Sequence, residues 1–87
     1  MHFVYILQSE KNGRYYIGST NDLERRIVEH NSGKTKSLKH LVPFRVVFKK
    51  GFIDPKDART MERKLKKMKS RVIIEQIISD QELKLGL

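Results

Sequence analysis

Apolar positions follow two different periods in the first part of the chain. Residues 2–8, HFVYILQ, form a β-branched and aromatic run, which predicts a strand buried on both faces. Residues 9–14, SEKNGR, follow, and their Asn12-Gly13 pair is a strong hairpin signal. Residues 14–19, RYYIGS, then predict the returning strand. The chain is therefore expected to open with a β-hairpin.

The pattern next changes to a helical period and back again. Residues 22–31 predict a helix, with Asn21 or Thr20 as its N-cap and acidic side chains in its first turn. Gly33 follows this segment and suits a left-handed helix end. The alternating, β-rich run at 44–51 predicts a third strand.

Two more helices are expected in the last third of the chain. One begins with Asp54 as N-cap and Pro55 at the first helical position. Its apolar stripe is Ala58, Met61, Leu65 and Met68, at spacings of three, four and three. The apolar run after Arg71 suits a strand as well as a helix, and we interpret it as a closing helix over the sheet. The predicted fold is one α+β domain over residues 1–87, with strand-strand-helix-strand-helix-helix order and a small, mostly antiparallel sheet.

Charge points to the class of partner. Nineteen Lys and Arg oppose ten Asp and Glu, which gives a formal net charge of +9. Ten of the nineteen cations lie between Lys49 and Arg71. A basic concentration of this kind predicts a nucleic-acid partner. A solvated basic helix or attraction to anionic lipid are the alternatives.

Other residue types narrow the chemistry. Without cysteine the chain has no disulfide framework and no thiolate zinc site. His2, His30 and His40 lack the short paired spacing of a metal cluster. The first residues contain no basic n-region and only a short apolar run, so we expect a cytoplasmic protein without a secretory signal or membrane span.

Candidate chemistry begins in the hairpin. A loop with an even number of residues puts Tyr5, Tyr16 and Gly18 on one face of the sheet. A two-residue loop would stagger the two tyrosines by four residues, whereas a four-residue loop closed by Ser9 and Arg14 would reduce this to two. The sequence leaves both registers open. Gly18 is expected to leave a gap for a phosphate backbone, although each tyrosine alone also suits a packing role.

The two helices add three polar candidates. Arg26 and His30 fall at the margin of the first helix's apolar stripe, where an arginine can hold a phosphate. Glu62 flanks the stripe of the second helix and is a candidate ligand for a hard divalent cation. The plainer alternatives are an exposed arginine, a boundary histidine, and an ion pair between Glu62 and Lys66 one turn later.

These pieces occur in a recognisable order. FVY at 3–5, YIG at 16–18, Arg26 ten residues after Tyr16, His30 four later and a helical Glu62 together resemble the GIY-YIG nuclease family. The chain is most similar to its small stand-alone bacterial members, which resemble the nuclease domain of the excision-repair incision protein. The chain departs from the family pattern at Phe3, which replaces the first motif's glycine, and has no asparagine after Glu62.

The resemblance implies a fold and an activity. It implies a three-stranded antiparallel sheet flanked by helices, and cleavage of DNA phosphodiester bonds with one bound Mg²⁺ or Mn²⁺. Tyr5 and Tyr16 match the tyrosines of the two motifs, and either is a candidate base. Arg26 matches the catalytic arginine, Glu62 the metal-binding glutamate, and His30 a position that can orient groups or shuttle a proton.

The leading hypothesis is a structure-selective or repair-associated DNA endonuclease. Branched and flap DNA are among the candidate substrates, and a protein partner would supply specificity because no recognition helix is evident. The residues expected to contact nucleic acid are Gly18, Lys36, Lys39, Arg63 and Lys66. The alternatives are a nucleic-acid-binding module on the same fold with weak or lost cleavage, and a basic protein–protein or ribosome-associated adaptor.

Overall fold

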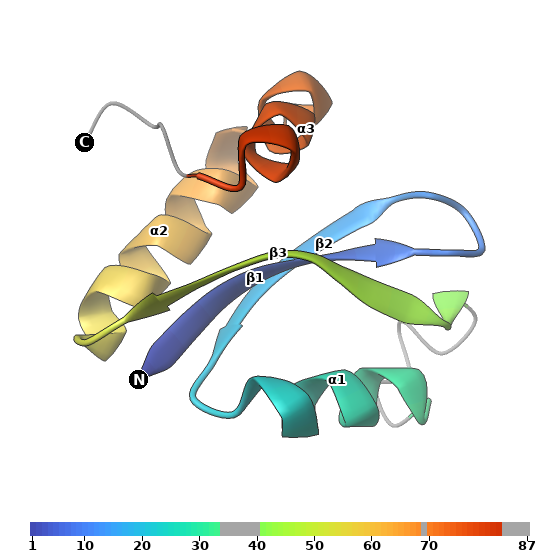
Figure 1. Ribbon diagram of the computed structural model, residues 1–87, viewed down its shortest axis with the longest axis horizontal. Coiled ribbons are helices and arrows are strands. Elements are labelled where there is room, and N and C mark those ends of the chain that lie inside the picture. Colours follow the sequence, from blue (N-terminus) through green and yellow to red (C-terminus); the bar gives the residue numbers. More distant parts are fainter. Residues whose placement is uncertain (34–40, 69, 83–87) are drawn as a thin grey trace.

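The computed structural model describes residues 1–33, 41–68 and 70–82. The elements in chain order are β1 (His2–Ser9), β2 (Tyr15–Thr20), α1 (Leu23–Asn31), β3 (Phe44–Phe52), α2 (Pro55–Met68) and α3 (Arg71–Asp80). This order confirms the predicted α+β fold, including the closing helix (Figure 1). Within the described ranges, no helix is long and apolar enough to cross a membrane.

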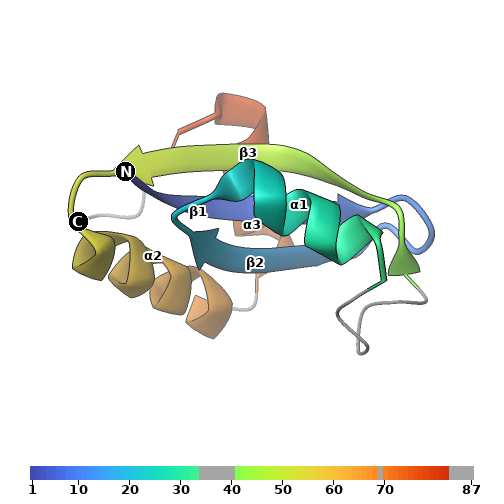
Figure 2. The same ribbon diagram turned by 90° about the horizontal axis from the view of Figure 1, so that it is seen from below.

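The three strands form one antiparallel sheet with the order β2-β1-β3. Helix α1 covers one face, and α2 and α3 cover the other (Figure 1). Seen from the α1 side, α2 lies beside the end of β2 (Figure 2). Because β1 is central and both faces are covered, its side chains are apolar on both faces, as its sequence predicts.

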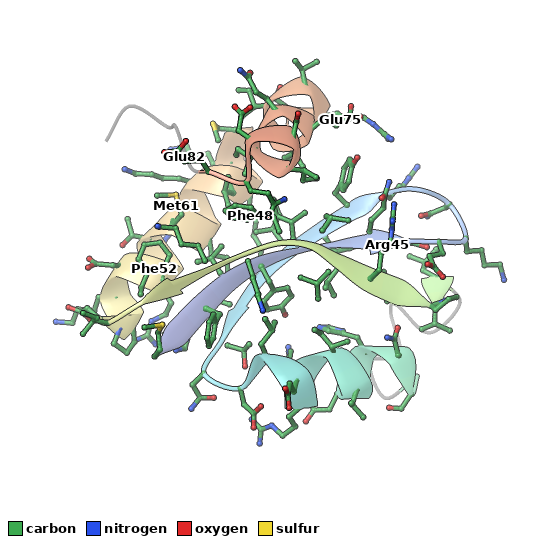
Figure 3. The ribbon with its side chains drawn as sticks, in the orientation of Figure 1. Arg45, Phe48, Phe52, Met61, Glu75 and Glu82 are labelled. Carbon is green, nitrogen blue, oxygen red and sulfur yellow. The ribbon has the colours of Figure 1, made fainter. Side chains whose placement is uncertain are left out.

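The core therefore has two parts, one on each side of the sheet. Val4 and Ile6 of β1 pack with Phe48 against α2 and α3, and Figure 3 shows Phe48 on this side of the sheet. Tyr5 and Leu7 point the other way and pack toward α1. The predicted α2 stripe faces the first part: Ala58, Met61 and Leu65 are buried and Met68 is half-buried.

The hairpin has the four-residue loop of the two registers considered. The Ser9 N–H donates to the Arg14 carbonyl at 2.9 Å, and Tyr5 lies directly opposite Gly18. The Ser9 hydroxyl accepts hydrogen bonds from the backbone N–H groups of Lys11 and Asn12, at 3.1 and 3.3 Å. These bonds give the N–H groups of Lys11 and Asn12 a partner within the loop. They therefore stabilise the four-residue loop over a two-residue turn.

Helix ends follow local side-chain capping. At α1 the predicted N-cap was wrong: the cap is Asp22, whose Oδ1 accepts from the Arg25 N–H at 3.2 Å. Thr20 cannot serve because it still belongs to β2, and its hydroxyl accepts instead from the Asp22 N–H at 3.1 Å. Asn21 lies between the strand and the cap, so α1 begins at Leu23.

The two later helices begin as their sequences indicate. Pro55 is the first residue of α2, and the Asp54 carboxylate accepts from the Lys56 N–H at 2.9 Å. Ser70 caps α3 by accepting from the Ile73 N–H at 3.3 Å. The cap separates α3 from α2, so the apolar run after Arg71 packs as a helix on the sheet.

Candidate active site

A cleft of about 510 Å³ opens at the edge strand β2. Residues from both faces of the sheet reach it, because β2 is an edge strand and no other strand of the described residues pairs with its outer edge. All five predicted catalytic residues line it: Tyr5, Tyr16, Arg26, His30 and Glu62. They come from four elements, β1, β2, α1 and α2. The fold therefore brings together residues separated by up to 57 positions in the chain.

Tyr5 enters the cleft through the space left by Gly18. Only 3% of Tyr5 is exposed, and a Cβ at position 18 would overlap its hydroxyl and lie 2.6 Å from its Cζ. The prediction that Gly18 leaves a gap for a phosphate backbone was therefore wrong, because the Tyr5 phenol fills that gap. Gly18 shapes the cleft by admitting this ring at close range.

His30 lies next to the Tyr5 hydroxyl. The Tyr5 oxygen and His30 Nε2 are 3.4 Å apart, and only 6% of His30 is exposed. Burial and the charge of Arg26 lower the pKa of His30 below 6.5. The imidazole is therefore neutral at pH 7, and a neutral imidazole can accept a hydrogen bond or a proton from the phenol.

Arg26 lies at the rim of the cleft, at the margin predicted for it. Contact with the Tyr5 hydroxyl raises the pKa of Arg26, with a smaller contribution from Glu29. Its Nη1 is 3.5 Å from the Glu29 carboxylate, and nearly half of its side chain remains exposed. Arg25 instead pairs with Asp22 and Glu29 on the outer part of α1. Arg26 can thus hold a phosphate oxygen while it remains next to Tyr5.

Tyr16 shares the α1 side of the sheet with Tyr5, two residue pairs nearer the hairpin loop. It lies opposite Leu7 and contacts Phe44 edge-on, with 5.3 Å between ring centroids. Tyr16 is half-buried, and its hydroxyl makes no hydrogen bond to any residue that the structure describes. The phenol can therefore serve both as a packing group and as a polar group facing the cleft.

Glu62 approaches the cleft from the opposite side of the sheet. Its Oε1 accepts a hydrogen bond from the Ser19 hydroxyl at 2.5 Å, and its Oε2 lies 2.7 Å from Lys66 Nζ. Burial raises the pKa of Glu62, but the bonds from Lys66 and Ser19 outweigh burial and lower the pKa overall. Glu62 is therefore a carboxylate at neutral pH. The expected ion pair with Lys66 is present, and the role of Glu62 as a metal ligand stays a prediction.

Two cleft residues with polar side-chain groups were not among the predicted site residues. Ser19 orients Glu62, and Tyr15 lines the end of the cleft near the hairpin. Strand alternation indicates that Ser19 faces away from Gly18, toward the helices on the other side. Its partner is 43 residues away, so no local pattern could have named it.

The donor set limits what metal the cleft can hold. No cluster of three or more metal-ligating His, Cys, Asp or Glu side chains occurs among the described residues. Mg²⁺ is commonly bound by one or two carboxylates, with water and substrate phosphates as its other ligands. Glu62, with the Ser19 hydroxyl beside it, fits this one-carboxylate mode. Metal binding at Oε2 requires the Lys66 ammonium group to move away from that oxygen.

Basic side chains extend from the cleft along α2. Lys66 lines the cleft, and Arg63, about one helical turn before Lys66, is exposed. At about 100° per residue, Arg59, Arg63 and Lys66 all lie within about 100° of Glu62, on its solvent side. A shallow groove of about 230 Å³ between Thr60, Arg63, Lys64 and Lys67 continues this surface. We call the surface formed by Arg59, Arg63, Lys64, Lys66 and Lys67 the α2 basic face. Lys36 and Lys39, also predicted contacts, lie outside the described residues.

Comparison with known proteins identifies the family. Residues 1–75 match the model of the GIY-YIG catalytic domain. The chain belongs to the GIY-YIG catalytic domain family. Membership confirms the resemblance noted from the motifs and supports a nuclease-type function.

The relatives of this GIY-YIG domain include small bacterial proteins. A UPF0213 protein of Streptococcus pneumoniae serotype 4 is 37% identical over 68 residues, which cover 77% of this chain and 68% of the relative. UPF0213 protein BH0048 of Halalkalibacterium halodurans is 40% identical over 79 residues, 90% of this chain and 82% of the relative. The NMR structure of BH0048 from Bacillus halodurans superposes with a TM-score of 0.57 at 36% identity, covering 98% of this chain and 96% of that one. These names state no reaction or substrate.

Proposed function

We propose that this GIY-YIG domain is a divalent-metal-dependent endonuclease that hydrolyses DNA phosphodiester bonds. The observation that carries the proposal is the meeting of Tyr5, Tyr16, Arg26, His30 and Glu62 in one cleft. Hydrolysis of a phosphodiester needs a proton acceptor for the attacking water, positive charge beside the phosphate oxygens, and help for the leaving oxygen. This cleft contains candidates for each requirement.

Phosphate binding is assigned to the cations at the rim. Arg26 keeps its charge at all relevant pH values, and its exposed guanidinium can donate two hydrogen bonds to phosphate oxygens. The α2 basic face extends the positive surface from Glu62 outward, so the DNA backbone would leave the cleft over this helix. Arg63 and Lys66 remain proposed contacts on that path.

Proton transfer is assigned to Tyr5 and His30. The Tyr5 hydroxyl has a neutral imidazole 3.4 Å away, so it can pass its own proton to His30 Nε2 while it takes one from the attacking water. The water oxygen then bonds to phosphorus, and the bond to the leaving sugar oxygen breaks. Tyr16 has no such second acceptor in the described part of the chain, and we assign its hydroxyl to orienting the water or a phosphate oxygen.

Glu62 is the residue that would hold the metal ion. Its carboxylate is ionised and faces the cleft, and Ser19 fixes the direction of one oxygen. A bound Mg²⁺ or Mn²⁺ would supply positive charge to the phosphate and the leaving oxygen. Lys66 keeps Glu62 charged and paired before substrate arrives, and can move to a phosphate when the carboxylate takes another partner.

Finer features of the substrate belong to the same proposal. Branched or flap DNA, a role in repair and a partner protein that supplies specificity are its finer parts, since no recognition helix is evident among the described residues. A second candidate is a binding module on this fold with weak or lost cleavage. The 2.7 Å pairing of Glu62 with Lys66 favours it, because an ammonium at that place competes with a metal ion.

The test is cleavage of a panel of labelled DNAs at increasing Mg²⁺ or Mn²⁺. The panel holds single-stranded, duplex, flap and branched forms, and the enzyme is compared with Glu62→Gln and Tyr5→Phe. Glu24→Gln is the matched control, since Glu24 is an exposed carboxylate outside the cleft lining. We expect metal-dependent cutting by the parent and the control and none by Glu62→Gln. Binding without cutting at every metal concentration would reject the nuclease in favour of the binding module.

A further inference from the structure

A third tyrosine lies at the hairpin end of the cleft and has no part in the chemistry above. Tyr15 is the first residue of β2 and lines the same cleft as Glu62. Its ring points to the side of the sheet opposite Tyr16, where it packs against the core cluster beneath α2 and α3. Arg71, the first residue of α3, places its Cζ over this ring, 5.1 Å from the centroid.

Two contacts hold the Arg71 guanidinium in place. The Tyr15 ring lies beneath it, and its Nε is 3.4 Å from the Glu75 carboxylate one turn along α3. Figure 3 shows Glu75 on the outer part of α3. The Arg71 side chain is nevertheless 60% exposed, so much of the guanidinium still faces solvent. A planar cation fixed in this way loses little freedom when something stacks on it.

We propose that Tyr15 and Arg71 form a stacking platform for one unpaired nucleobase. Unpaired bases stack on aromatic rings and on guanidinium planes in nucleic-acid-binding proteins, and the positive charge also favours the neighbouring phosphate. Tyr15 lines the same cleft as Arg26, to which phosphate binding is assigned, so the stacked base belongs to a nucleotide near that phosphate. A base paired within a duplex is already stacked and cannot present its face. The substrate is therefore nucleic acid with an unpaired base at the cleft.

This inference rests on the proposed function for the position of the phosphate, but not for cleavage. The competing explanation is structural, with Arg71 joining α3 to the hairpin through Tyr15. Loss of a structural contact would weaken binding of all nucleic acids equally. Loss of a stacking platform would weaken binding of a strand with bases, but not of an abasic strand with the same sugar-phosphate backbone.

The experiment compares two dye-labelled probes in buffer with EDTA, where no metal-dependent cleavage occurs. One probe is a short oligothymidylate, and the other has the same backbone and length but is abasic at every position. Fluorescence anisotropy gives Kd for each. We expect the abasic probe to bind about ten-fold more weakly to the parent protein. We expect Tyr15→Leu to reduce this ratio toward one and Tyr15→Phe, which keeps a ring, to preserve it.

Arg71→Lys keeps the charge and removes the plane, so it should also reduce the ratio. Arg25→Lys is its matched control, because Arg25 is similarly exposed on a helix and pairs with a glutamate four residues later. A ratio near one in the parent, or a ratio unchanged in Tyr15→Leu and Arg71→Lys, would overturn the platform even if DNA is cut. If the binding ratios are as expected but no DNA in the metal-dependent cleavage panel is cut, the platform is supported and the nuclease is rejected.

Discussion

Replacing Gly18 by alanine tests whether the position of Tyr5 determines activity. The new Cβ would overlap the Tyr5 hydroxyl and lie 2.6 Å from its Cζ, whereas ordinary contacts begin at 3.4 Å. The ring must therefore move by at least about 0.8 Å (3.4 minus 2.6) to restore an ordinary contact at Cζ, and further at the hydroxyl. Its hydroxyl would then lie in a different place relative to His30 Nε2 and the attacking water.

A displacement of about 1 Å at a reacting group can cost on the order of 100-fold in rate. We therefore expect Gly18→Ala to lower kcat for DNA cleavage by roughly this factor. Because Gly18 lies in a regular strand paired with Tyr5, alanine is compatible with its backbone, and the protein should remain folded. Single-turnover cleavage at saturating Mn²⁺ measures the rate, and thermal unfolding checks the fold.

The control for this prediction is a double-mutant cycle with Tyr5→Phe. If Gly18→Ala acts through the Tyr5 hydroxyl, it should have little further effect once that hydroxyl is gone. Full activity of Gly18→Ala, or an equal loss in both backgrounds, would refute the assignment of the proton acceptor to Tyr5. A loss of metal affinity alone would point to Glu62 instead.

Two further predictions follow from the charged groups of the site. His30 has a lowered pKa in the folded protein, so the unfolded chain binds its proton more readily as pH falls below 6.5, and folding stability should decline through this range. Urea unfolding at pH 8 and pH 5 measures the decline, and His30→Gln should make it smaller; an identical decline in the variant would contradict the burial argument. Binding of DNA should weaken with salt, and Arg63→Gln or Lys66→Gln should each reduce the slope of log K against log salt by about one. Arg45→Gln, a cation on β3 outside the α2 basic face, should leave the slope unchanged, and equal effects of all three would contradict a defined path for the backbone.

The order and type of the elements could be predicted because their signals are local. A doubly apolar strand, an Asn-Gly loop, a proline at the first turn and an apolar stripe at helical spacing each involve residues close in the chain. The run after Arg71, whose pattern suits a strand as well as a helix, forms the predicted helix because Ser70 caps it and its apolar face packs on the sheet. The N-cap of α1 was wrong because strand pairing kept Thr20 in β2, and pairing is not a local property.

The five candidate catalytic residues could be named from the sequence, but their arrangement could not. Local periodicity assigned Tyr5, Tyr16 and Arg26 to faces of elements, and the ordered motifs indicated the family. Only the tertiary structure decided that Tyr5 lies opposite Gly18, because the Ser9 side chain that closes the four-residue loop also donates a hydrogen bond to the Leu41 carbonyl, 32 residues away. It also decided that Ser19 meets Glu62 and that Arg71 covers Tyr15. These contacts join residues 43 and 56 positions apart. Such residues meet only when α2 and α3 pack on the sheet, and the pattern of neighbouring residues does not specify that packing.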